Sequence, residues 1–277
     1  LPMSRKKMLI IPVFIPFGGC PHKCVFCDQN GITGASAMPS EKEVVETIEK
    51  YLSTWKGAGR IEVAFYGGSF TGLPIEVQKK YLECAAGFVR NGRVDGIRVS
   101  TRPDYISWEV VLFLKENRVT TVELGAQSMS DEVLKLSGRG HGSGATVEAM
   151  KILKAARLTT GIQFMPGLPG DTVDSIIETT ERVIALRPDF VRVYPTLVFK
   201  DTALYREYLN KKYFPWGLDE MAAVCKEIFV RLDKAGIPVI RVGLQTTDSL
   251  RENFVAGPYH PSFRQLVENG TSNTASP

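Results

Sequence analysis

The stretch "FGGCPHKCVFCDQNGITG", from Phe17 to Gly34, holds three of the chain's five cysteines between glycine-containing flanks. It comes just after the apolar run "MLIIPVFI" (Met8 to Ile15), whose β-branched residues predict a buried strand. The spacing C-x3-C-x2-C lets three thiolates converge on one centre, and the residues are Cys20, Cys24 and Cys27. We call residues 17–34 the cysteine loop, and it is the first candidate for a functional site.

Three clustered thiols, rather than four, indicate a centre with one open position. A structural zinc site normally takes four protein ligands, and His22 lies between two of the cysteines, where reaching the same ion would be strained. The remaining cysteines, Cys84 and Cys225, lie in helical patterns and are interpreted as small buried hydrophobes. All-thiolate ligation with one free position suits a [4Fe–4S] cluster. A zinc-dependent or redox protein that uses the same thiols is the alternative.

Strand-like and helix-like segments alternate along the rest of the chain. The start of the first predicted helix is well marked, because Ser40 and Glu43 have the spacing of a capping box. Such alternation predicts a parallel sheet covered by helices. Strands are predicted over residues 8–15, 60–68, 96–100, 119–128, 159–170, 189–197 and 237–243, and helices over 39–55, 74–89, 107–117, 144–158, 172–188 and 218–234.

The predicted fold class is α/β, a partial (β/α)6-7 barrel of parallel strands, in preference to an open doubly wound sheet. Nearly every predicted strand ends in small or polar residues, and ligands of parallel α/β folds bind at those carboxyl ends. We expect one domain over residues 1–264. The small, polar residues 265–277 are expected to form a flexible tail.

Composition sets broad limits on the type of protein. The chain has 277 residues, is 44% hydrophobic and carries a net charge of +4, which suits an anionic substrate or RNA but requires neither. No apolar run reaches the roughly 20 residues that cross a bilayer, so no membrane association is expected. The odd number of cysteines argues against a secreted disulfide framework, and a cytoplasmic location is expected.

The cysteine loop resembles the radical S-adenosylmethionine enzymes, whose signature is C-x3-C-x-aromatic-C. Cys20, Cys24, Phe26 and Cys27 match it, with the aromatic residue in place. The resemblance implies a [4Fe–4S] cluster on the three thiols, with S-adenosyl-L-methionine chelating the fourth iron. It also implies an external one-electron reductant and reductive cleavage of the cofactor to a 5′-deoxyadenosyl radical.

Further segments resemble the radical domain of the elongator catalytic subunit and the oxygen-independent coproporphyrinogen oxidase branch. They are "VSTRPDYI" (99–106), "VELGAQSMSDEVLKLSGRGH" (122–141), "MPGLPG" (165–170) and "RVYPTLVFKDTALYREY" (192–208). This resemblance weakly favours tRNA or a nucleoside as the substrate. A porphyrin-type small molecule is the alternative, as is a cluster-bearing module that binds RNA or protein without turnover.

The same resemblance assigns residues to the S-adenosylmethionine site. It places Gly67, Gly68 and Ser69 near the amino group, Gln127 near the ribose, and Arg139 on the carboxylate, which an arginine can bind with two hydrogen bonds. From the residues alone, Arg139 is equally compatible with a solvated loop. The complete predicted cofactor-binding set is Phe26, Gly67, Gly68, Ser69, Ser100, Arg102, Gln127, Arg139, Gln163, Met165 and Tyr194.

Overall fold

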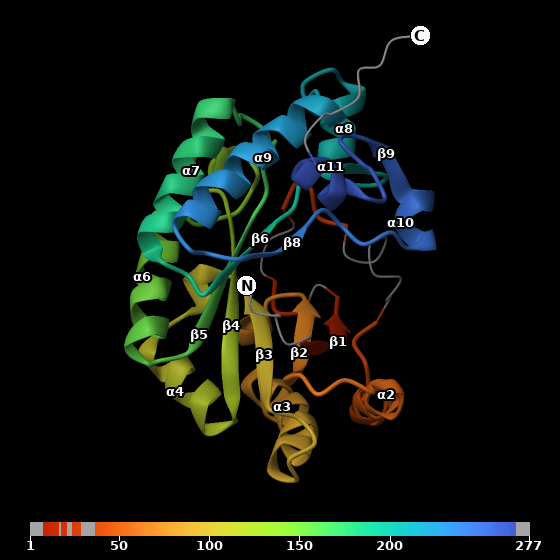
Figure 1. Ribbon diagram of the computed structural model, residues 1–277, viewed down its shortest axis with the longest axis vertical. Coiled ribbons are helices and arrows are strands. Elements are labelled where there is room, and N and C mark those ends of the chain that lie inside the picture. Colours follow the sequence, from red (N-terminus) through yellow and green to blue (C-terminus); the bar gives the residue numbers. More distant parts are fainter. Residues whose placement is uncertain (1–7, 17, 21–23, 29–36, 270–277) are drawn as a thin grey trace.

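A computed structural model describes residues 8–16, 18–20, 24–28 and 37–269. Within them, seven parallel strands form one sheet in the order β1-β2-β3-β4-β5-β6-β8 (Figure 1). The strands are β1 (Leu9–Ile15), β2 (Ile61–Gly67), β3 (Gly96–Thr101), β4 (Val119–Gln127), β5 (Thr159–Phe164), β6 (Phe190–Val193) and β8 (Val239–Val242). Six of them lie within the predicted strand segments, and β3 runs one residue past its predicted end at Ser100.

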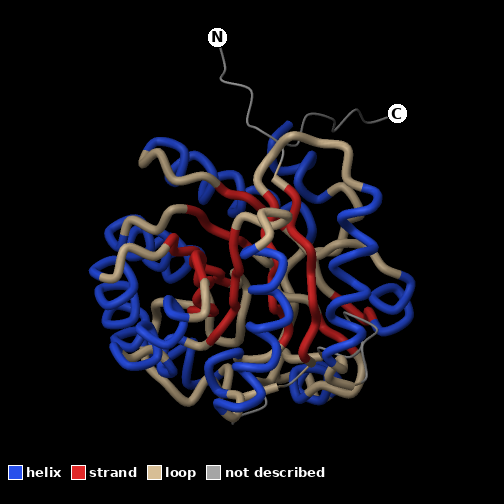
Figure 2. The backbone as a smooth tube through the Cα atoms, turned by 90° about the horizontal axis from the view of Figure 1, so that it is seen from below, coloured by secondary structure: helices blue, strands red, loops and turns tan. Residues whose placement is uncertain are grey.

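The sheet is curled, with helices around its outside (Figure 2). Strands that follow one another in the chain are mostly neighbours, as in β1 and β2, which pair from Leu9↔Ile61 to Ile15↔Gly67. The ends of the sheet are β1 and β8, so the barrel is partial. The predicted fold class is confirmed. All carboxyl ends of the strands meet at one edge, which we call the carboxyl rim.

The helices between the strands cover the outer face. They are α2 (Glu41–Thr54), α3 (Ile75–Arg90), α4 (Trp108–Glu116), α5 (Asp131–Leu136), α6 (Ser143–Ala155), α7 (Val173–Leu186), α8 (Ala203–Leu209) and α9 (Leu218–Lys234). The predicted capping box at α2 is confirmed: the Glu43 amide donates to Ser40 Oγ (3.3 Å) and the Ser40 amide donates to the Glu43 carboxylate (2.7 Å). The short helices α5 and α8 were not predicted.

The two faces of the sheet differ in chemistry. On the face toward the helices, Val63, Phe65 and Val99 belong to the main apolar core, and each is fully buried. Cys225 of α9 is fully buried in this core and Cys84 of α3 packs against it, which confirms that both are packing residues. The other face of the strands carries polar residues and is described with the site below.

The C-terminal part adds small elements: the antiparallel strands β7 (Val198–Phe199) and β9 (Phe254–Ala256), and the helices α10 (Asp248–Asn253) and α11 (Phe263–Asn269). Helix α11 contacts α9 and β8, and buries Phe263 and Val267. Residues 265–269, which the sequence assigns to the expected tail, lie in α11, where two apolar residues four positions apart provide a buried face. No helix among the described residues is long and apolar enough to span a bilayer.

Candidate functional site

The described part of the cysteine loop is fastened by backbone hydrogen bonds to segments far along the chain. The Val25 amide donates to the Ser137 carbonyl (3.2 Å), and the Leu204 amide donates to the Val25 carbonyl (2.8 Å). Phe26 packs beside an apolar cluster of Val198 and Leu204. Cys24, next to these anchors, is buried. The end of α5 and the start of α8 thus fix the position of this thiol.

Cys20 and Cys24 lie within electrostatic reach of each other. Burial raises the pKa of the Cys20 thiol, and Cys24 raises it further, whereas the Ser69 backbone, Arg102 and Arg139 oppose that rise. Cys27 is half-buried, and its amide donates to the Cys24 carbonyl (3.0 Å). Across the part of the chain that the structure describes, no three Cys, His, Asp or Glu side chains lie close enough together to hold a metal ion. His22 lies outside the described residues.

Arg139 joins the cysteine loop to the carboxyl rim. Its Nη1 donates to Cys24 Sγ (3.2 Å) and its Nη2 donates to the Gly125 carbonyl (2.5 Å). Only 5% of Arg139 is exposed, so a solvated loop position is wrong. Gly138 and Gly140 on either side have φ of +66° and +75°, a conformation that favours glycine and turns the chain so that the arginine points inward.

Arg102 lies beside Arg139 and is equally buried, with 3% exposed. Two of its nitrogens contact the Asp104 carboxylate (2.9 and 2.8 Å), and Nη2 also donates to the Arg139 carbonyl (2.6 Å). The His141 ring lies 3.3 Å from Arg139 Nη2, and burial, followed by Arg139, lowers the pKa of the imidazole. In the described structure, Arg102 Nη1 and Arg139 Nε are buried with no hydrogen-bond partner.

The glycine turn after β2 lies directly against the start of the cysteine loop. Gly67 has φ +103°, and a Cβ on Gly68 would come within 2.0 Å of the Gly18 carbonyl oxygen. The Ser69 amide donates to that same oxygen (2.7 Å). The Ser69 hydroxyl is buried and contacts Thr101 Oγ1 (2.9 Å) as well as the Arg102 amide (3.1 Å). Ser69 therefore joins the turns after β2 and β3, with its hydroxyl already engaged by the protein.

The remaining predicted residues follow the carboxyl rim across β3 to β6. Gln127 has φ +69°, its carbonyl accepts from the Met165 amide (2.8 Å), and its Oε1 accepts from Gln163 Nε2 (3.3 Å). Ser100 is half-buried on β3. The half-buried Tyr194 comes just after β6, and its hydroxyl accepts from Arg192 Nη1 (3.1 Å). These residues thus follow the carboxyl rim, and Ser69, Arg102 and Arg139 are the members of the predicted set with described interactions with Cys20 or Cys24.

Sequence reasoning missed a buried charge network on the inner face. Arg98 pairs with Glu62 and Glu123 at 2.6 Å each, and these three side chains are at most 3% exposed. Arg192 Nε lies 3.0 Å from Glu123 Oε2, and the Tyr66 hydroxyl donates to Glu123 Oε1 (3.0 Å). The sequence held a signal for this network, because each of these charged residues is the single charge within its strand. The inner face below the rim is therefore polar, and within this network two arginines are balanced by two glutamates.

Comparison with known proteins agrees with this arrangement. A family model described as Radical SAM superfamily matches residues 14–183, and one described as Radical_SAM C-terminal domain matches residues 188–272. The chain belongs to the radical SAM superfamily, and it is a radical SAM enzyme.

The chain is also similar to named proteins. It is 27% identical over 271 residues to "tRNA uridine(34) acetyltransferase" of Methanocaldococcus infernus, which covers 81% of this chain and 51% of the relative. It is 27% identical over 240 residues to human "Elongator complex protein 3", covering 79% of this chain and 43% of the relative. The chain thus spans about half the length of these curated relatives.

Two solved structures share the fold. The M. infernus Elp3 structure with an N-terminal deletion superposes with a TM-score of 0.74 at 23% identity, covering 96% of this chain and 63% of the other. Coproporphyrinogen III oxidase (HemN) from Escherichia coli superposes with a TM-score of 0.58 at 19% identity, covering 83% and 53%. The predicted resemblance to both branches is confirmed.

Proposed function

We propose that this chain binds a [4Fe–4S] cluster through Cys20, Cys24 and Cys27, and S-adenosyl-L-methionine beside it, to carry out radical chemistry on tRNA or a nucleoside. The observation that carries the proposal is the meeting of three separate segments at one place. The thiol of Cys24, the buried Arg139 and the turn at Gly68 are distant in sequence and adjacent in the fold.

The protein groups fit the proposed cofactors. Arg139 Nε and Arg102 Nη1 are buried donors without a partner in the described structure, and leaving a buried donor unpaired costs about 1–3 kcal/mol or more when it is charged. A bound anionic group would satisfy them, and cofactor carboxylate or cluster thiolates are such groups. Two guanidinium groups also favour the deprotonated thiols that iron–sulfur ligation requires.

Each residue then has a defined part in the proposed site. When bound, the cluster and S-adenosylmethionine supply a 5′-deoxyadenosyl radical. Arg139 orients the carboxylate of the cofactor and holds Cys24, while the absence of a side chain at Gly68 lets the β2 turn lie against the cysteine loop. Gln127 and Gln163 offer amide groups along the rim, and the balanced charge network closes the inner face below them.

The substrate class rests on the relatives. One of the curated relatives named above is a tRNA uridine(34) acetyltransferase, and the match covers 51% of its length. A net charge of +4 is compatible with a polyanionic substrate. We therefore place tRNA, or one of its nucleosides, ahead of a porphyrin.

An oxygen-free reconstitution tests the proposal. Loaded protein is expected to hold about four irons per chain and, with dithionite, to convert S-adenosylmethionine to 5′-deoxyadenosine, with tRNA consumed or modified in the same reaction. Cys20→Ala, Cys24→Ala and Cys27→Ala should each lose the iron, whereas Cys84→Ala, a partly buried thiol on α3, should keep it.

The other outcomes separate the alternatives. One zinc per chain and no iron would overturn the proposal in favour of a zinc protein. Iron without 5′-deoxyadenosine would leave only a binding module. Turnover of coproporphyrinogen, but not of tRNA, would replace the proposed substrate.

A further inference from the structure

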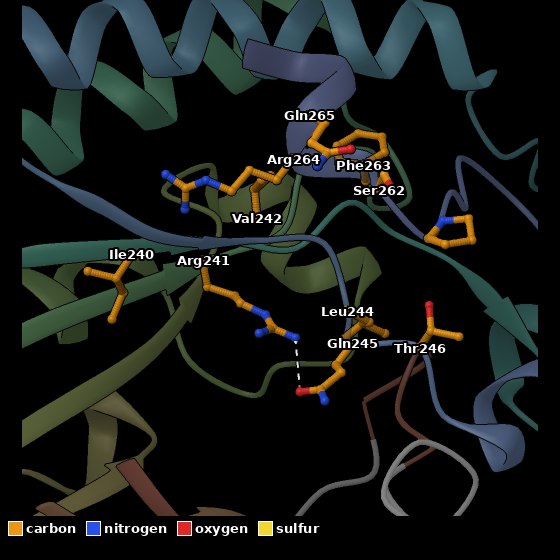
Figure 3. A pocket seen from close by; sticks show the side chains of 11 residues that line it. Ile240, Arg241, Val242, Leu244, Gln245, Thr246, Ser262, Phe263, Arg264 and Gln265 are labelled. Atoms are coloured by element: carbon orange, nitrogen blue, oxygen red, sulfur yellow. Dashed lines mark hydrogen bonds between the residues drawn. The ribbon is translucent and has the colours of Figure 1, made fainter. Parts of the chain in front are cut away.

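A pocket of about 500 Å³ lies at the β8 end of the sheet, beside the start of α11 (Figure 3). None of the residues assigned above to the cluster or to S-adenosylmethionine lines it. Its walls come from β8, the turn that follows β8 and the segment that leads into α11. Arg241 and Gln245 point toward each other on one side of the strand, and Arg264 lies on the other side (Figure 3).

Arg241 carries a charge that the protein leaves unmatched. In the β6–β8 register it lies directly beside Arg192, which is paired with Glu123 at 3.0 Å. Arg241 has only neutral acceptors, the Gly243 carbonyl at 3.3 Å and Gln245 Oε1 at 3.5 Å. Among the described residues no carboxylate lies within ion-pair distance of it. A half-buried guanidinium with two long contacts to neutral oxygens retains its attraction for an anion.

The rest of the pocket preserves that positive charge. No aspartate or glutamate is found among its lining residues, and the second lining arginine, Arg264, is matched by Glu268 at 2.7 Å. The other polar groups are neutral donors, including the exposed Gln245 amide and the hydroxyl groups of Thr246 and Ser262. One net positive charge at Arg241, with the Gln245 amide on the same side of the strand, matches a singly charged anion such as a phosphodiester.

The pocket lies beside the proposed active site. Strand β8 pairs in parallel with β6, so Arg241 approaches the same rim that carries Tyr194 after β6. We propose that Arg241, Gln245 and Thr246 bind a backbone phosphodiester of the RNA substrate, and that this contact positions the neighbouring nucleotide at the rim. The inference rests on the proposed function, since it names the substrate contact of that same site.

The test compares charge variants of the full-length protein in binding of labelled tRNA, measured by fluorescence anisotropy. Between about 50 and about 200 mM salt, one lost phosphate contact should lower the slope of log affinity against log salt concentration by about one. Arg241→Gln should show that change and bind tRNA about tenfold more weakly at the lower salt concentration. Arg241→Lys should keep the slope, because it keeps the charge.

The matched control is Arg93→Gln, which removes a surface arginine already paired with Glu49 at 2.6 Å, between α2 and α3. It should bind tRNA as the unmodified protein does. A binding curve and salt slope for Arg241→Gln equal to those of the unmodified protein would overturn the pocket assignment. Melting temperatures of both glutamine variants show whether the folds are comparable. If Arg241→Gln is misfolded, Arg241→Met takes its place with the same expected loss of affinity and of salt slope, and Arg241→Lys remains the variant that keeps the charge.

The failure of this inference can be told apart from failure of the proposed function. If the unmodified protein binds no tRNA, pyrophosphate is titrated by calorimetry. Binding that disappears in Arg241→Gln would then mark an anion site and refute the RNA assignment, and no binding at all would refute the site itself. Formation of 5′-deoxyadenosine without any RNA reports separately on the cofactor chemistry.

Discussion

Replacing Gly68 with alanine tests the contact between the β2 turn and the cysteine loop. The φ of Gly68 lies outside the left-handed region, so alanine meets no conformational penalty there and the effect is purely steric. The added Cβ would lie 2.0 Å from the Gly18 carbonyl oxygen and 2.6 Å from the Gly18 nitrogen. These are backbone atoms, so the two turns must separate by more than an ångström.

The expected cost has two parts. Overpacking at a tight contact costs about 1–3 kcal/mol. Separation also strains the hydrogen bonds from Ser69 to the Gly18 carbonyl (2.7 Å) and from Gly68 to the Ile15 carbonyl (3.0 Å), each of which contributes about 1 kcal/mol. We expect Gly68→Ala to lower the free energy of unfolding by about 2–4 kcal/mol. Because Cys20 follows Gly18 closely, iron content after reconstitution should fall as well.

Urea denaturation followed by circular dichroism measures the stability change, and Gly87→Ala is the matched control. Gly87 lies inside α3, where the nearest atom to an added Cβ is Arg90 Nη2 at 3.9 Å. Alanine there should stabilise the protein by about 0.5–1 kcal/mol through helix propensity. If Gly68→Ala unfolds at the same urea concentration as the unmodified protein and keeps its iron, the turns do not touch as described.

Two further substitutions test buried charges. Glu123→Gln leaves Arg98 and Arg192 without their shared carboxylate and should lower the free energy of unfolding by about 3–5 kcal/mol. The surface change Glu49→Gln should lower it by less than about 1 kcal/mol. Equal urea midpoints for the two variants would contradict the network. Burial raises the pKa of Asp171 to about 6, so its stabilising protonated form is lost as pH rises through that value. Relative to Asp171→Asn, the unmodified protein should therefore lose about 1–2 kcal/mol between pH 4.5 and pH 7.5, allowing for partial exposure, and a constant difference across that range would refute the assignment.

The sequence predicts the fold well because its signals are local. Apolar β-branched runs separated by amphipathic helices determine the parallel sheet, and Ser40 with Glu43 determines the start of α2. The short helices were missed because one or two turns carry too little periodicity. The short helix α11 was missed for the same reason, since the burial of Phe263 and Val267 depends on packing against α9 and β8, which are distant in sequence from them or separated by loops.

The sequence signal for the candidate site is strongest where spacing alone indicates the chemistry, as in the cysteine loop. The contact of Arg139 with Cys24 joins residues far apart in sequence, so only a family resemblance could indicate it. The carboxylate of Glu123 shared by Arg98 and Arg192 was not predicted, because one partner lies on the neighbouring strand β3 and the other on β6, two strands away. The tight approach of Gly68 to Gly18 depends likewise on the final packing of two loops.

Part of the support behind the cysteine loop comes from the C-terminal part of the chain. Phe26 rests on Val198 and Leu204, and the Leu204 amide holds the Val25 carbonyl, although these partners fall in the region matched by the separate C-terminal family model. A fragment that stops before that region would keep the three thiols of the cysteine loop and lose the contacts that Val198 and Leu204 make behind them. The two matched regions thus form one structural unit, and a displacement of α8 would shift the backbone at Val25, next to Cys24.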